Sequence, residues 1–361
     1  MPLSPTESQR YLRHLQLPEV GVAGQEKLRA ARVLVVGAGG LGCPILQYLA
    51  AAGVGTLGIV DADTVALSNL QRQILYGPDD VGQPKAACAA HALARLNPLV
   101  SCEVHAVRAD LHTVRALVPA YDLVIDGSDN FPTRYLLNDA CALFDKPLVS
   151  GAIYRFEGQV SVFNYQGGPT YRCLFPTPPG PDEAPDCNAT GVLGVLPGLI
   201  GCVQATEALK VLLGIGEVLS GRLWVLDTLS FQSRTLKFRR REEQAAITLD
   251  TANKADYAEL CHAAPARLSP GSLREMLAGP HAPLLLDVRE PAEYAAGHLP
   301  GALLLPLSEL PNRATELPEG PLVVYCQRGG RSARAAALLR EELGRAGVQE
   351  LAGGYEAWLA I

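Results

Sequence analysis

The sequence predicts an α/β protein with two domains: one with a mostly parallel sheet and an antiparallel extension, and then a smaller α/β domain. Two observations lead to this prediction. Short apolar, strand-like runs alternate with helix-like segments through the first half of the chain, and a second alternation starts near residue 265. Such alternation builds a parallel sheet with helices on both faces. A chain of 361 residues is also long enough for two domains.

Hydrophobic patterning places the individual elements. Apolar β-branched runs predict strands, and Ala- and Leu-rich segments predict helices. In the first half, the predicted strands are 32–36, 56–60, 101–107, 121–125 and 147–150, and the predicted helices are 41–52, 85–96 and 133–144. Past residue 151 the pattern changes, and 158–165 and 222–226 are expected to be antiparallel strands. A Pro-rich loop, 175–185, and an apolar helix, 198–213, lie between them.

A charged, weakly patterned segment at 239–265 separates the two parts. Its composition is typical of a solvated linker. We expect a first domain at 1–247, a linker at 248–264 and a second domain at 265–361. In the second domain the predicted strands are 284–286, 303–305 and 322–325, and the predicted helix is 331–343.

Composition excludes several classes of protein. A net charge of -6 gives no general attraction to nucleic acid or to anionic membranes. The start of the chain has no apolar core of a signal peptide, and the longest apolar run, 192–203, is too short to span a bilayer. The nine cysteines include no CxxC pair. We therefore expect no disulfide framework and a reducing cytoplasm.

A glycine-rich turn follows the first predicted strand and opens the first predicted helix. Its glycines are Gly37, Gly39, Gly40 and Gly42, in the run GAGGLG. Glycines allow a tight turn and let backbone N–H groups approach phosphate oxygens, while the helix N-terminus favours an anion. Asp61 follows about twenty positions later, where an acidic residue binds a ribose hydroxyl in a Rossmann-like fold. These features fit a nicotinamide-dependent oxidoreductase equally well.

Polar residues beyond Asp61 favour ATP over a dinucleotide. Asn69 and Arg72 lie in the run LSNLQRQ, and Lys85 ends the run GQPK. An enzyme that holds a triphosphate and stabilises charge at its α-phosphorus needs such groups, whereas a dehydrogenase does not. Asp129 lies in DGSDN, after another predicted strand, where a carboxylate can hold a Mg²⁺ ion that bridges phosphates.

Six ordered motifs resemble the adenylating domain of the ubiquitin-activating superfamily. The similarity is strongest to the bacterial sulfur-carrier adenylyltransferases of the molybdopterin-synthase and thiamine pathways, and it covers roughly residues 8–240. The motifs are RYLRHLQLP from Arg10, GAGGLG from Gly37, DADTVALSNLQRQ from Asp61, GQPK from Gly82, GSDN from Gly127 and GVLGVLPGLIG from Gly191.

The resemblance implies a role for each of these residues. Asp61 would bind the ribose of ATP, and Asp129, beside Asn130, would hold Mg²⁺. The residues that would contact the phosphates are Asn69, Arg72 and Lys85. Arg13 would reach the active site of a second subunit, which implies a homodimer. We expect Arg13, Arg72 and Asp129 to act in catalysis. Structural alternatives remain: Asp61 as a turn residue, Asp129 as a helix cap and Arg13 as a surface residue.

Members of the superfamily commonly hold a structural zinc with two CxxC pairs, and this sequence departs from that pattern. The first pair falls at 170–173, where only Cys173 is present, and the second falls near 239–246, which has no cysteine. Tetrahedral zinc needs four ligands, and Cys261 and His262 do not complete a recognised spacing. We expect no zinc and a structural role for Cys173.

Cys187 lies in a polar loop between the Pro-rich segment and the GVLGVLPG motif. Related enzymes have a cysteine here that can link to the carrier or resolve an intermediate. The resemblance therefore favours a functional Cys187, and an incidental loop cysteine is the alternative.

Cys326 ends a buried strand-like run and begins a glycine- and arginine-rich loop before a helix at Ser332. The loop consists of Gln327, Arg328, Gly329, Gly330 and Arg331. Glycines let N–H groups point at the sulfur, and the helix dipole and two arginines favour a thiolate or a persulfide anion. A buried strand-end cysteine without chemistry is the alternative.

Residues 265–361 resemble a rhodanese domain. The motifs are LLLDVREPAEYAAGHLPGALLLPL from Leu284, VVYCQRGGRSARAAALL from Val323 and LAGGYEAWL from Leu351. The resemblance implies that Cys326 carries sulfur as a persulfide. Glu293 and His298 also match family positions, and we expect Asp287 and Arg289 to brace the loop.

The two resemblances together predict one pathway. The first domain would use ATP and Mg²⁺ to adenylate the C-terminal glycine of a ubiquitin-like sulfur carrier that ends in Gly-Gly. The persulfide on Cys326 would then attack the acyl-adenylate, and Cys187 is a candidate for resolving the acyl disulfide. The sulfur donor would be a cysteine desulfurase or thiosulfate.

Three alternatives remain at this point. An NAD-dependent oxidoreductase has no use for Arg72 or Lys85. A binding module, in which the rhodanese domain only docks a partner, predicts that Cys326 is dispensable. An activator for ubiquitin-like conjugation, with a docking rhodanese domain, would pass a thioester to a lysine. The sequence leaves open whether the carrier serves molybdopterin, thiamine, cysteine or tRNA thiolation.

Overall fold

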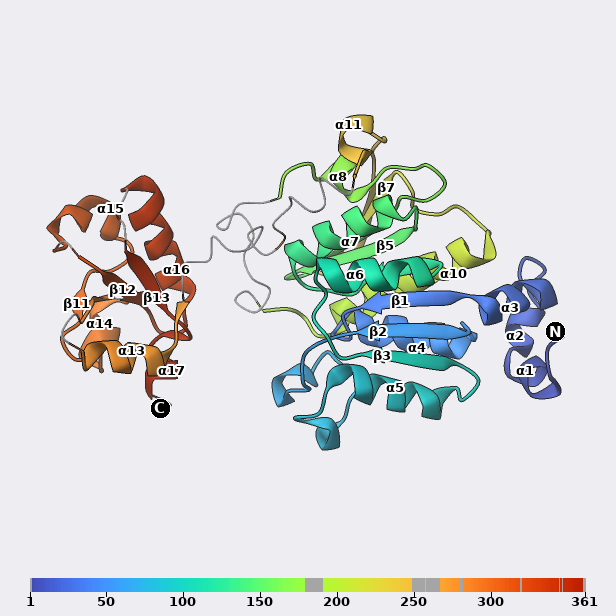
Figure 1. Ribbon diagram of the computed structural model, residues 1–361, viewed down its shortest axis with the longest axis horizontal. Coiled ribbons are helices and arrows are strands. Elements are labelled where there is room, and N and C mark those ends of the chain that lie inside the picture. The colour runs from blue at the N-terminus through green and yellow to red at the C-terminus, as the bar shows by residue number, and fades with distance from the viewer. Residues whose placement is uncertain are drawn as a thin grey trace. The chain divides into compact units, whose positions relative to one another are not determined.

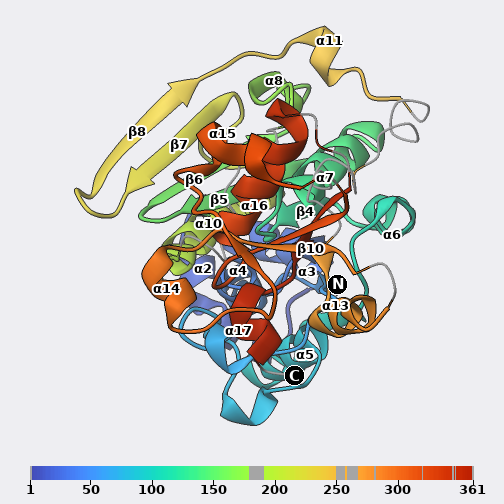
Figure 2. The same ribbon diagram turned by 90° about the vertical axis from the view of Figure 1, so that its left-hand side faces the viewer.

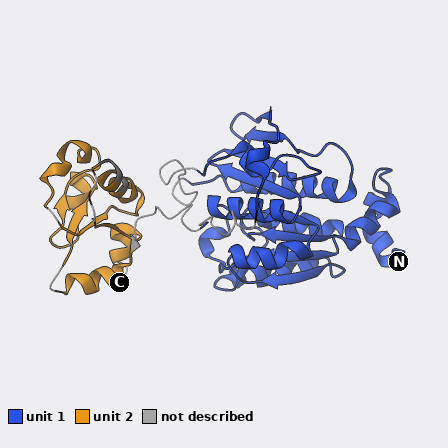
Figure 3. Ribbon diagram, turned by 45° about the horizontal axis from the view of Figure 1, so that its top comes forward, with its two compact units in different colours: residues 1–178, 186–260 blue, residues 179–185, 261–361 orange. Residues whose placement is uncertain are grey.

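The computed structural model describes residues 2–178, 191–248, 257, 267–279, 282–318, 320–343, 345 and 347–359. Those before residue 258 belong to one compact unit and those from 267 onward to another (Figure 3). Each unit has its own sheet and its own hydrophobic core. Cys187, Cys261 and His262 lie outside the described residues.

An eight-stranded sheet forms the first unit, in the order β3-β2-β1-β4-β5-β6-β7-β8 (Figure 1). The strands are β1 Arg32–Val36, β2 Thr56–Val60, β3 Ser101–His105, β4 Leu123–Asp126, β5 Leu148–Tyr154, β6 Glu157–Phe163, β7 Arg222–Asp227 and β8 Gln232–Lys237. The first five strands in this order, from β3 to β5, pair in parallel with their neighbours. From β5 onward, β6, β7 and β8 pair antiparallel, and β8 lies at the outer edge in Figure 2. The predicted parallel sheet with an antiparallel extension is confirmed.

Helices cover both faces of this sheet. The α-helices described in this unit are α1 Pro5–Arg10, α2 Leu12–Leu15, α3 Gly21–Ala30, α4 Gly42–Ala52, α5 Lys85–Leu96, α6 Leu111–Leu117, α7 Phe131–Leu143, α8 Tyr171–Leu174, α10 Val195–Leu213 and α11 Glu242–Ala245. Side chains alternate along β1, because successive residues of a strand point to opposite faces. Val33 and Val35 join the core under α4 and α10, while Leu34 and Val36 join the core under α7.

The long helix α10 is a core element of the sheet domain. Its 19 residues are long and apolar enough to match a membrane span by length and composition. It packs, however, against α4, β5 and β6. Its buried Gln204 donates to the Asp126 carbonyl at 2.7 Å, and its buried Glu207 accepts from the Leu219 N–H at 2.8 Å. These polar contacts identify it as a helix of the protein interior.

The second unit is a small α/β domain with a five-stranded parallel sheet, in the order β11-β10-β12-β13-β9. The strands are β9 Arg267–Leu268, β10 Leu284–Asp287, β11 Leu303–Leu304, β12 Leu322–Tyr325 and β13 Val348–Leu351. The helices are α13 Pro270–Leu277, α14 Pro291–Ala295, α15 Leu310–Arg313, α16 Gly330–Ala337, a π-helical turn Leu338–Glu342, and α17 Gly354–Leu359.

The segment that the sequence analysis interprets as a solvated linker carries structure at two points. Helix α11 forms at Glu242–Ala245. Tyr257 is buried, and its hydroxyl donates to Asp139 Oδ2 at 2.7 Å. Asp139 also accepts two bonds from the Arg172 guanidinium, at 2.7 Å each. A single aromatic residue in a weak pattern thus ties this segment to α7.

Hydrogen bonds occupy the positions where a zinc site would form. Thr170 and Cys173 lie opposite Arg241 and Gln244, each pair with two residues between them. Cys173 Sγ accepts from Arg241 N at 3.3 Å and donates to Arg241 O at 3.6 Å, and Thr170 Oγ1 donates to Gln244 O at 3.5 Å. Among the described residues no group of three or more His, Cys, Asp or Glu side chains could hold a metal ion. The residues at these four positions do not fit zinc, which needs four N, S or O ligands.

Elemental analysis of protein purified without added metal should find well under one zinc per chain, and a chelator should leave the melting temperature unchanged. A serine hydroxyl can both donate and accept at position 173, so Cys173→Ser should keep most of the stability. Cys173→Ala should cost about 1 kcal/mol, because two backbone groups lose a partner. Stoichiometric zinc, or a melting temperature that falls with chelator, would contradict this prediction.

Candidate active sites

A pocket of about 360 Å³ opens at the carboxyl ends of the parallel strands in the first unit. The turns after β1, β2 and β4 line it, together with the segment before α10. In the sheet order β1 lies between β2 and β4. After β1 the chain adds β2 and β3 on one side, and it then crosses over to add β4 and β5 on the other side of β1. Open α/β sheets bind ligands at such a switch point.

Glycines bring two backbone turns into contact at this pocket. Gly37 has φ +96°, and a Cβ there would lie 2.6 Å from the Gly127 carbonyl oxygen. A Cβ at Gly42 would lie 2.0 Å from the Gly37 carbonyl oxygen. Gly37 and Gly42 therefore shape the turn, while Gly39 and Gly40 line the pocket itself.

Asp61 lies between the glycine-rich turn and the pocket, which it lines. Its carboxylate accepts from the backbone N–H groups of Ala38 and Asp63, each at 2.8 Å. Burial raises the pKa of Asp61, and the two N–H bonds oppose that rise. Asp61 thus forms part of the turn and also faces the ligand space, so both roles considered for it are compatible.

The three residues expected at the phosphates all line the pocket. Lys85 is 6% exposed, and its Nζ forms an ion pair with Asp63 Oδ2 at 2.9 Å. Arg72 donates to the Ser68 carbonyl at 3.2 Å, and Asn69 accepts from Ala66 N at 3.2 Å. Their side chains are therefore positioned by the chain itself before a ligand binds.

Asp129 and Asn130 take different places at the start of α7. Asn130 is the N-cap, and its side chain accepts from Thr133 N at 3.0 Å. Asp129 is exposed and lines the pocket, whereas Asn130 is not among the lining residues. Asp129 is therefore not the cap of α7, and its carboxylate faces the ligand space. One carboxylate beside ATP phosphates fits Mg²⁺, which commonly binds through one or two carboxylates and substrate oxygens.

Three further residues of the pocket are missed by the sequence analysis: Asp63, Gln73 and Arg134. Gln73 is buried, and its Oε1 has no hydrogen-bond partner within the described part of the chain. Arg134 is buried over the Phe131 ring, 3.8 Å from Asp126 Oδ2. Asp63 and Gln73 lie inside quoted motifs, so their position was a usable signal, but nothing local marks Arg134.

Arg13 does not line the pocket of its own chain. It lies on α2, exposed, and donates to Gln16 Oε1 at 3.2 Å. Helix α3 leads directly into the amino end of β1, whereas the pocket lies at the carboxyl end. A role for Arg13 at a pocket therefore requires a second copy of the chain.

The second candidate site surrounds Cys326, which follows β12 and is 2% exposed. Its Sγ accepts from Gly329 N at 3.1 Å and lies 3.6 Å from Ser332 Oγ. Gly329 has φ +109° and precedes α16. The start of α17 fixes the backbone of the loop, because Tyr355 N donates to the Cys326 carbonyl at 2.8 Å. A Cβ at Gly354 would lie 2.3 Å from that same carbonyl.

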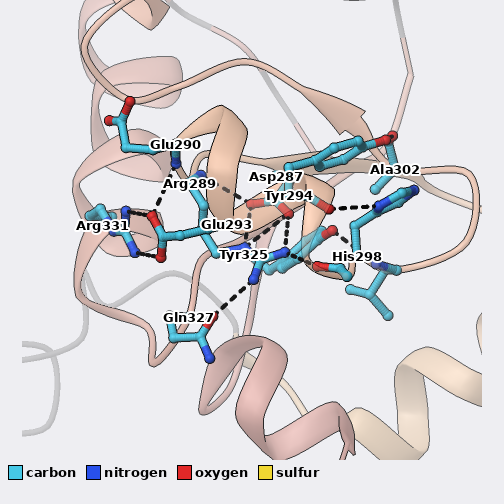
Figure 4. A network of polar contacts seen from close by, with 12 residues as sticks. Asp287, Arg289, Glu290, Glu293, Tyr294, His298, Ala302, Tyr325, Gln327 and Arg331 are labelled. Atoms are coloured by element: carbon cyan, nitrogen blue, oxygen red, sulfur yellow. Dashed lines mark hydrogen bonds and ion pairs between the residues drawn. The ribbon is translucent and has the colours of Figure 1, made fainter.

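Ion pairs fix the arginines around this loop (Figure 4). Arg331 forms two bonds of 2.6 Å with Glu293, and these bonds lower the pKa of Glu293 to about 2. The pair is therefore ionised at any physiological pH. Arg328 lies further out and pairs with Glu356 at 2.9 Å.

The expected brace from Asp287 and Arg289 is confirmed. Arg289 is 2% exposed, binds Asp287 through several bonds of 2.7 to 3.0 Å, and donates to Gln327 Oε1 at 2.8 Å. His298 lies elsewhere in the network (Figure 4), stacked on Tyr294 at 3.8 Å between ring centroids. Its Nδ1 lies 3.0 Å from the Tyr294 carbonyl oxygen, so it supports the turn after α14.

A pocket lined by glycines, Arg72 and Lys85 at the switch point of one sheet, and a thiol in a glycine- and arginine-rich loop on another, suit an enzyme that pairs nucleotide chemistry with sulfur chemistry. The chain belongs to the ThiF family, whose profile matches residues 11–247, and it carries a rhodanese-like domain at residues 269–361. It is an adenylyltransferase joined to a sulfurtransferase, and the NAD-dependent alternative is wrong.

Relatives share both parts of the chain. The probable adenylyltransferase/sulfurtransferase MoeZ of Mycobacterium tuberculosis is 44% identical over 99% of this chain and 94% of its own. The adenylyltransferase and sulfurtransferase MOCS3 of Mus musculus is 42% identical over 99% of this chain and 86% of its own. A crystal structure of E. coli MccB, 21% identical, matches 66% of this chain and 74% of its own with a TM-score of 0.57, and supports the fold.

The exposed position of Asp129 predicts a defect confined to Mg²⁺-dependent ATP binding. Calorimetric titration of wild type should show tighter ATP binding with Mg²⁺ than with EDTA, and Asp129→Ala should lose most of that difference. Its melting temperature should not change, because the side chain is exposed. Asp79→Ala removes another exposed aspartate, which does not line the pocket, and should behave as wild type. A full Mg²⁺ effect in Asp129→Ala would remove the assignment.

Proposed function

We propose that the first unit adenylates the C-terminal glycine carboxylate of a ubiquitin-like sulfur carrier ending in Gly-Gly, and that Cys326 then supplies sulfur to make the carrier thiocarboxylate. The observation that carries this proposal is the joining, in one chain, of an Arg72–Lys85–Asp129 pocket and a Cys326 anion loop. Acyl activation followed by sulfur transfer uses both sites in sequence.

Adenylation needs cations at the α-phosphorus. A carrier carboxylate oxygen attacks that phosphorus, and the bond to the bridging oxygen breaks, so pyrophosphate leaves. Lys85 and Arg72 line the pocket and stabilise the developing charge, while Asp61 orients the ribose. Asp129 would hold Mg²⁺, which would supply positive charge to the phosphate oxygens.

A second subunit would complete this site. Arg13 is exposed on α2 and does not line the pocket of its own chain, so we place it in the pocket of a partner in a homodimer. A partner arginine would add a further cation at the phosphates.

Sulfur transfer needs a nucleophile that is already an anion. The persulfide on Cys326 attacks the acyl carbon, the bond to the phosphate oxygen breaks, and AMP leaves with its electron pair. A second thiolate then attacks Cys326 Sγ, the carrier thiocarboxylate leaves, and a disulfide forms that an external thiol reduces. Cys187 is our candidate for that second thiolate.

Donor, carrier and compartment complete the proposal. A cysteine desulfurase or thiosulfate would load Cys326, and the carrier would serve molybdopterin, thiamine, cysteine or tRNA thiolation. We place the enzyme in the cytoplasm, because the seven cysteines in the described part of the chain are all free and a reducing compartment keeps them so.

Separate variants should split the two half-reactions. Cys326→Ala should keep carrier-dependent pyrophosphate exchange into ATP near the wild-type rate, because that step uses no sulfur. It should lose thiosulfate:cyanide sulfurtransferase activity and thiocarboxylate formation from a persulfide donor. A high concentration of sulfide should restore the thiocarboxylate, because an acyl-adenylate accepts any strong nucleophile. Mass spectrometry of the carrier measures the product.

Three controls make this test decisive. Asp129→Ala should show the reverse pattern, with exchange reduced about 100-fold or more and thiosulfate:cyanide activity intact. Cys202→Ala, on α10, should retain both activities. Cys187→Ala should retain both half-reactions and join them poorly. Normal thiocarboxylate formation by Cys326→Ala would instead make the rhodanese-like unit a docking module of a conjugation activator.

A further inference from the structure

A buried tyrosine lies in the segment that leads from the first unit to the second. Tyr257 is 8% exposed and belongs to the hydrophobic core cluster under α7. Its hydroxyl donates to Asp139 Oδ2 at 2.7 Å. The surrounding sequence, TANKADYAEL, contains no other aromatic residue. A polar spacer does not need such a contact to join two domains, so this tyrosine calls for a role of its own.

The contact is made to a carboxylate that already has partners. Asp139 is 2% exposed, and it accepts from the Arg172 guanidinium at 2.7 Å and from Asn138 Nδ2 at 2.8 Å. Burial raises the pKa of Tyr257, so its hydroxyl keeps the proton that it donates. A hydrogen bond to an ionised acceptor is stronger than one between neutral groups. Because Arg172 and Asn138 remain bound to Asp139, losing the tyrosine does not leave a buried charge without a partner.

Helix α7 carries both this contact and a wall of the nucleotide pocket. Arg134 lines the pocket, and Asp139 follows it on α7 after five residues. An α-helix rises about 1.5 Å per residue, so the two positions lie about 8 Å apart along the helix axis. Tyr257 therefore fixes the chain at a short axial distance from the pocket wall.

Fixing Tyr257 shortens the chain that can separate the two units. Nine residues, 258–266, lie between Tyr257 and β9, whereas 18 residues, 249–266, lie between Thr248 and β9. An extended chain spans at most about 3.6 Å per residue, so the contact lowers the upper limit of the span from about 68 Å to about 36 Å. The effective concentration of one tethered group at another falls roughly as the −3/2 power of tether length, so the shorter tether raises it about 2.6-fold.

We propose that Tyr257 anchors the tether of the rhodanese-like unit on α7, so that residues 258–266 alone set its reach and raise the effective concentration of the Cys326 persulfide at the acyl-adenylate. Tyr257 does not line the pocket, so it is a positioning residue. The inference rests on the proposed function in taking Cys326 as the group that transfers sulfur to the acyl-adenylate.

Two matched insertions in the full chain test the anchor. A 20-residue Gly/Ser segment is placed between Asp250 and Thr251 or between Ala263 and Ala264, with six residues separating each site from Tyr257. The readout is single-turnover thiocarboxylate formation from preformed acyl-adenylate and persulfide-loaded Cys326. The first insertion precedes the anchor and should leave this rate unchanged. The second should slow it about fivefold, because the tether grows about threefold in length.

Removing the anchor should abolish the difference between the two sites. In Tyr257→Ser both insertions should slow transfer equally, by about threefold. Pyrophosphate exchange and thiosulfate:cyanide activity each use one unit, so both should stay at the wild-type rate in every variant. A tyrosine that only stabilised the first unit would give no dependence on the insertion site. Equal slowing by the two insertions in the wild-type chain would therefore overturn the anchor.

Nitration by tetranitromethane, followed by mass spectrometry of the tyrosine peptides, tests the anchor without any substrate. Tyr257 should react slowly, as the fully buried Tyr135 does, whereas Tyr154 is 41% exposed and should react fast. A Tyr257 that reacts as fast as Tyr154 would overturn the anchor. If wild type ran both half-reactions but made no thiocarboxylate, the proposed function would fail, and nitration alone would decide the anchor.

Discussion

The nucleotide pocket depends on the backbone contact between the ends of β1 and β4. Gly37 and Gly127 approach so closely that a Cβ on either would lie under 3 Å from the other residue's carbonyl oxygen. Because no side chain intervenes, the turn that opens α4 lies directly on the turn that carries Asp129. The glycine-rich and carboxylate-bearing sides of the pocket therefore face one space. A side chain at either position would separate them, whatever cations the pocket retained.

Asp126, the last residue of β4, connects this strand to β5, α7 and α10. Its carboxylate accepts from Ser128 and Ser150, with Arg134 nearby, and its carbonyl accepts from Gln204 on α10. Burial raises the pKa of Asp126, while the Arg134 charge and the hydroxyl bonds oppose that rise. Since breaking a buried, partnered charge is strongly destabilising, this cluster holds α7 and α10 at fixed positions on the sheet. Ser128 and Arg134 belong to this cluster and also line the pocket, so the cluster fixes the position of that part of the pocket wall.

Elements with a strong hydrophobic pattern were predictable and those held by backbone bonds were not. β1, β2 and α5 match their predicted bounds, because their buried faces repeat clearly in the sequence. β8, with the sequence QSRTLK, is exposed along its whole length and is held by pairing with β7, so no apolar period marks it. Helices α1 to α3 and α6 were also missed, and the helix predicted at 331–343 leaves α-helical geometry after Ala337.

The pocket residues differ in the same way, between those that a local sequence motif marks and those that only the folded structure brings together. Those within motifs, such as Asp61 and Lys85, were identified because a short run of sequence builds their surroundings. Arg134 was missed because its place depends on Asp126 and Phe131, and only the folded α7 brings all three together. Asp129 and Asn130 are adjacent, and sequence alone could not tell which one caps α7.

Both units place a glycine turn, a helix N-terminus and cationic side chains around one candidate anion site. In the proposed function each receives an anion, a phosphate in one and a persulfide in the other, at the carboxyl end of a central parallel strand. In each, a glycine turn leads from that strand, β1 or β12, into a helix N-terminus, α4 or α16. Each unit also supplies its own cations, Lys85 and Arg72 in the first and Arg331 in the second. An acyl-adenylate and a persulfide are both negatively charged and repel one another in proportion to their unscreened charge. Lys85 is paired with Asp63 and Arg331 with Glu293, so an acidic side chain in each unit fixes the position of a cation before an anion arrives.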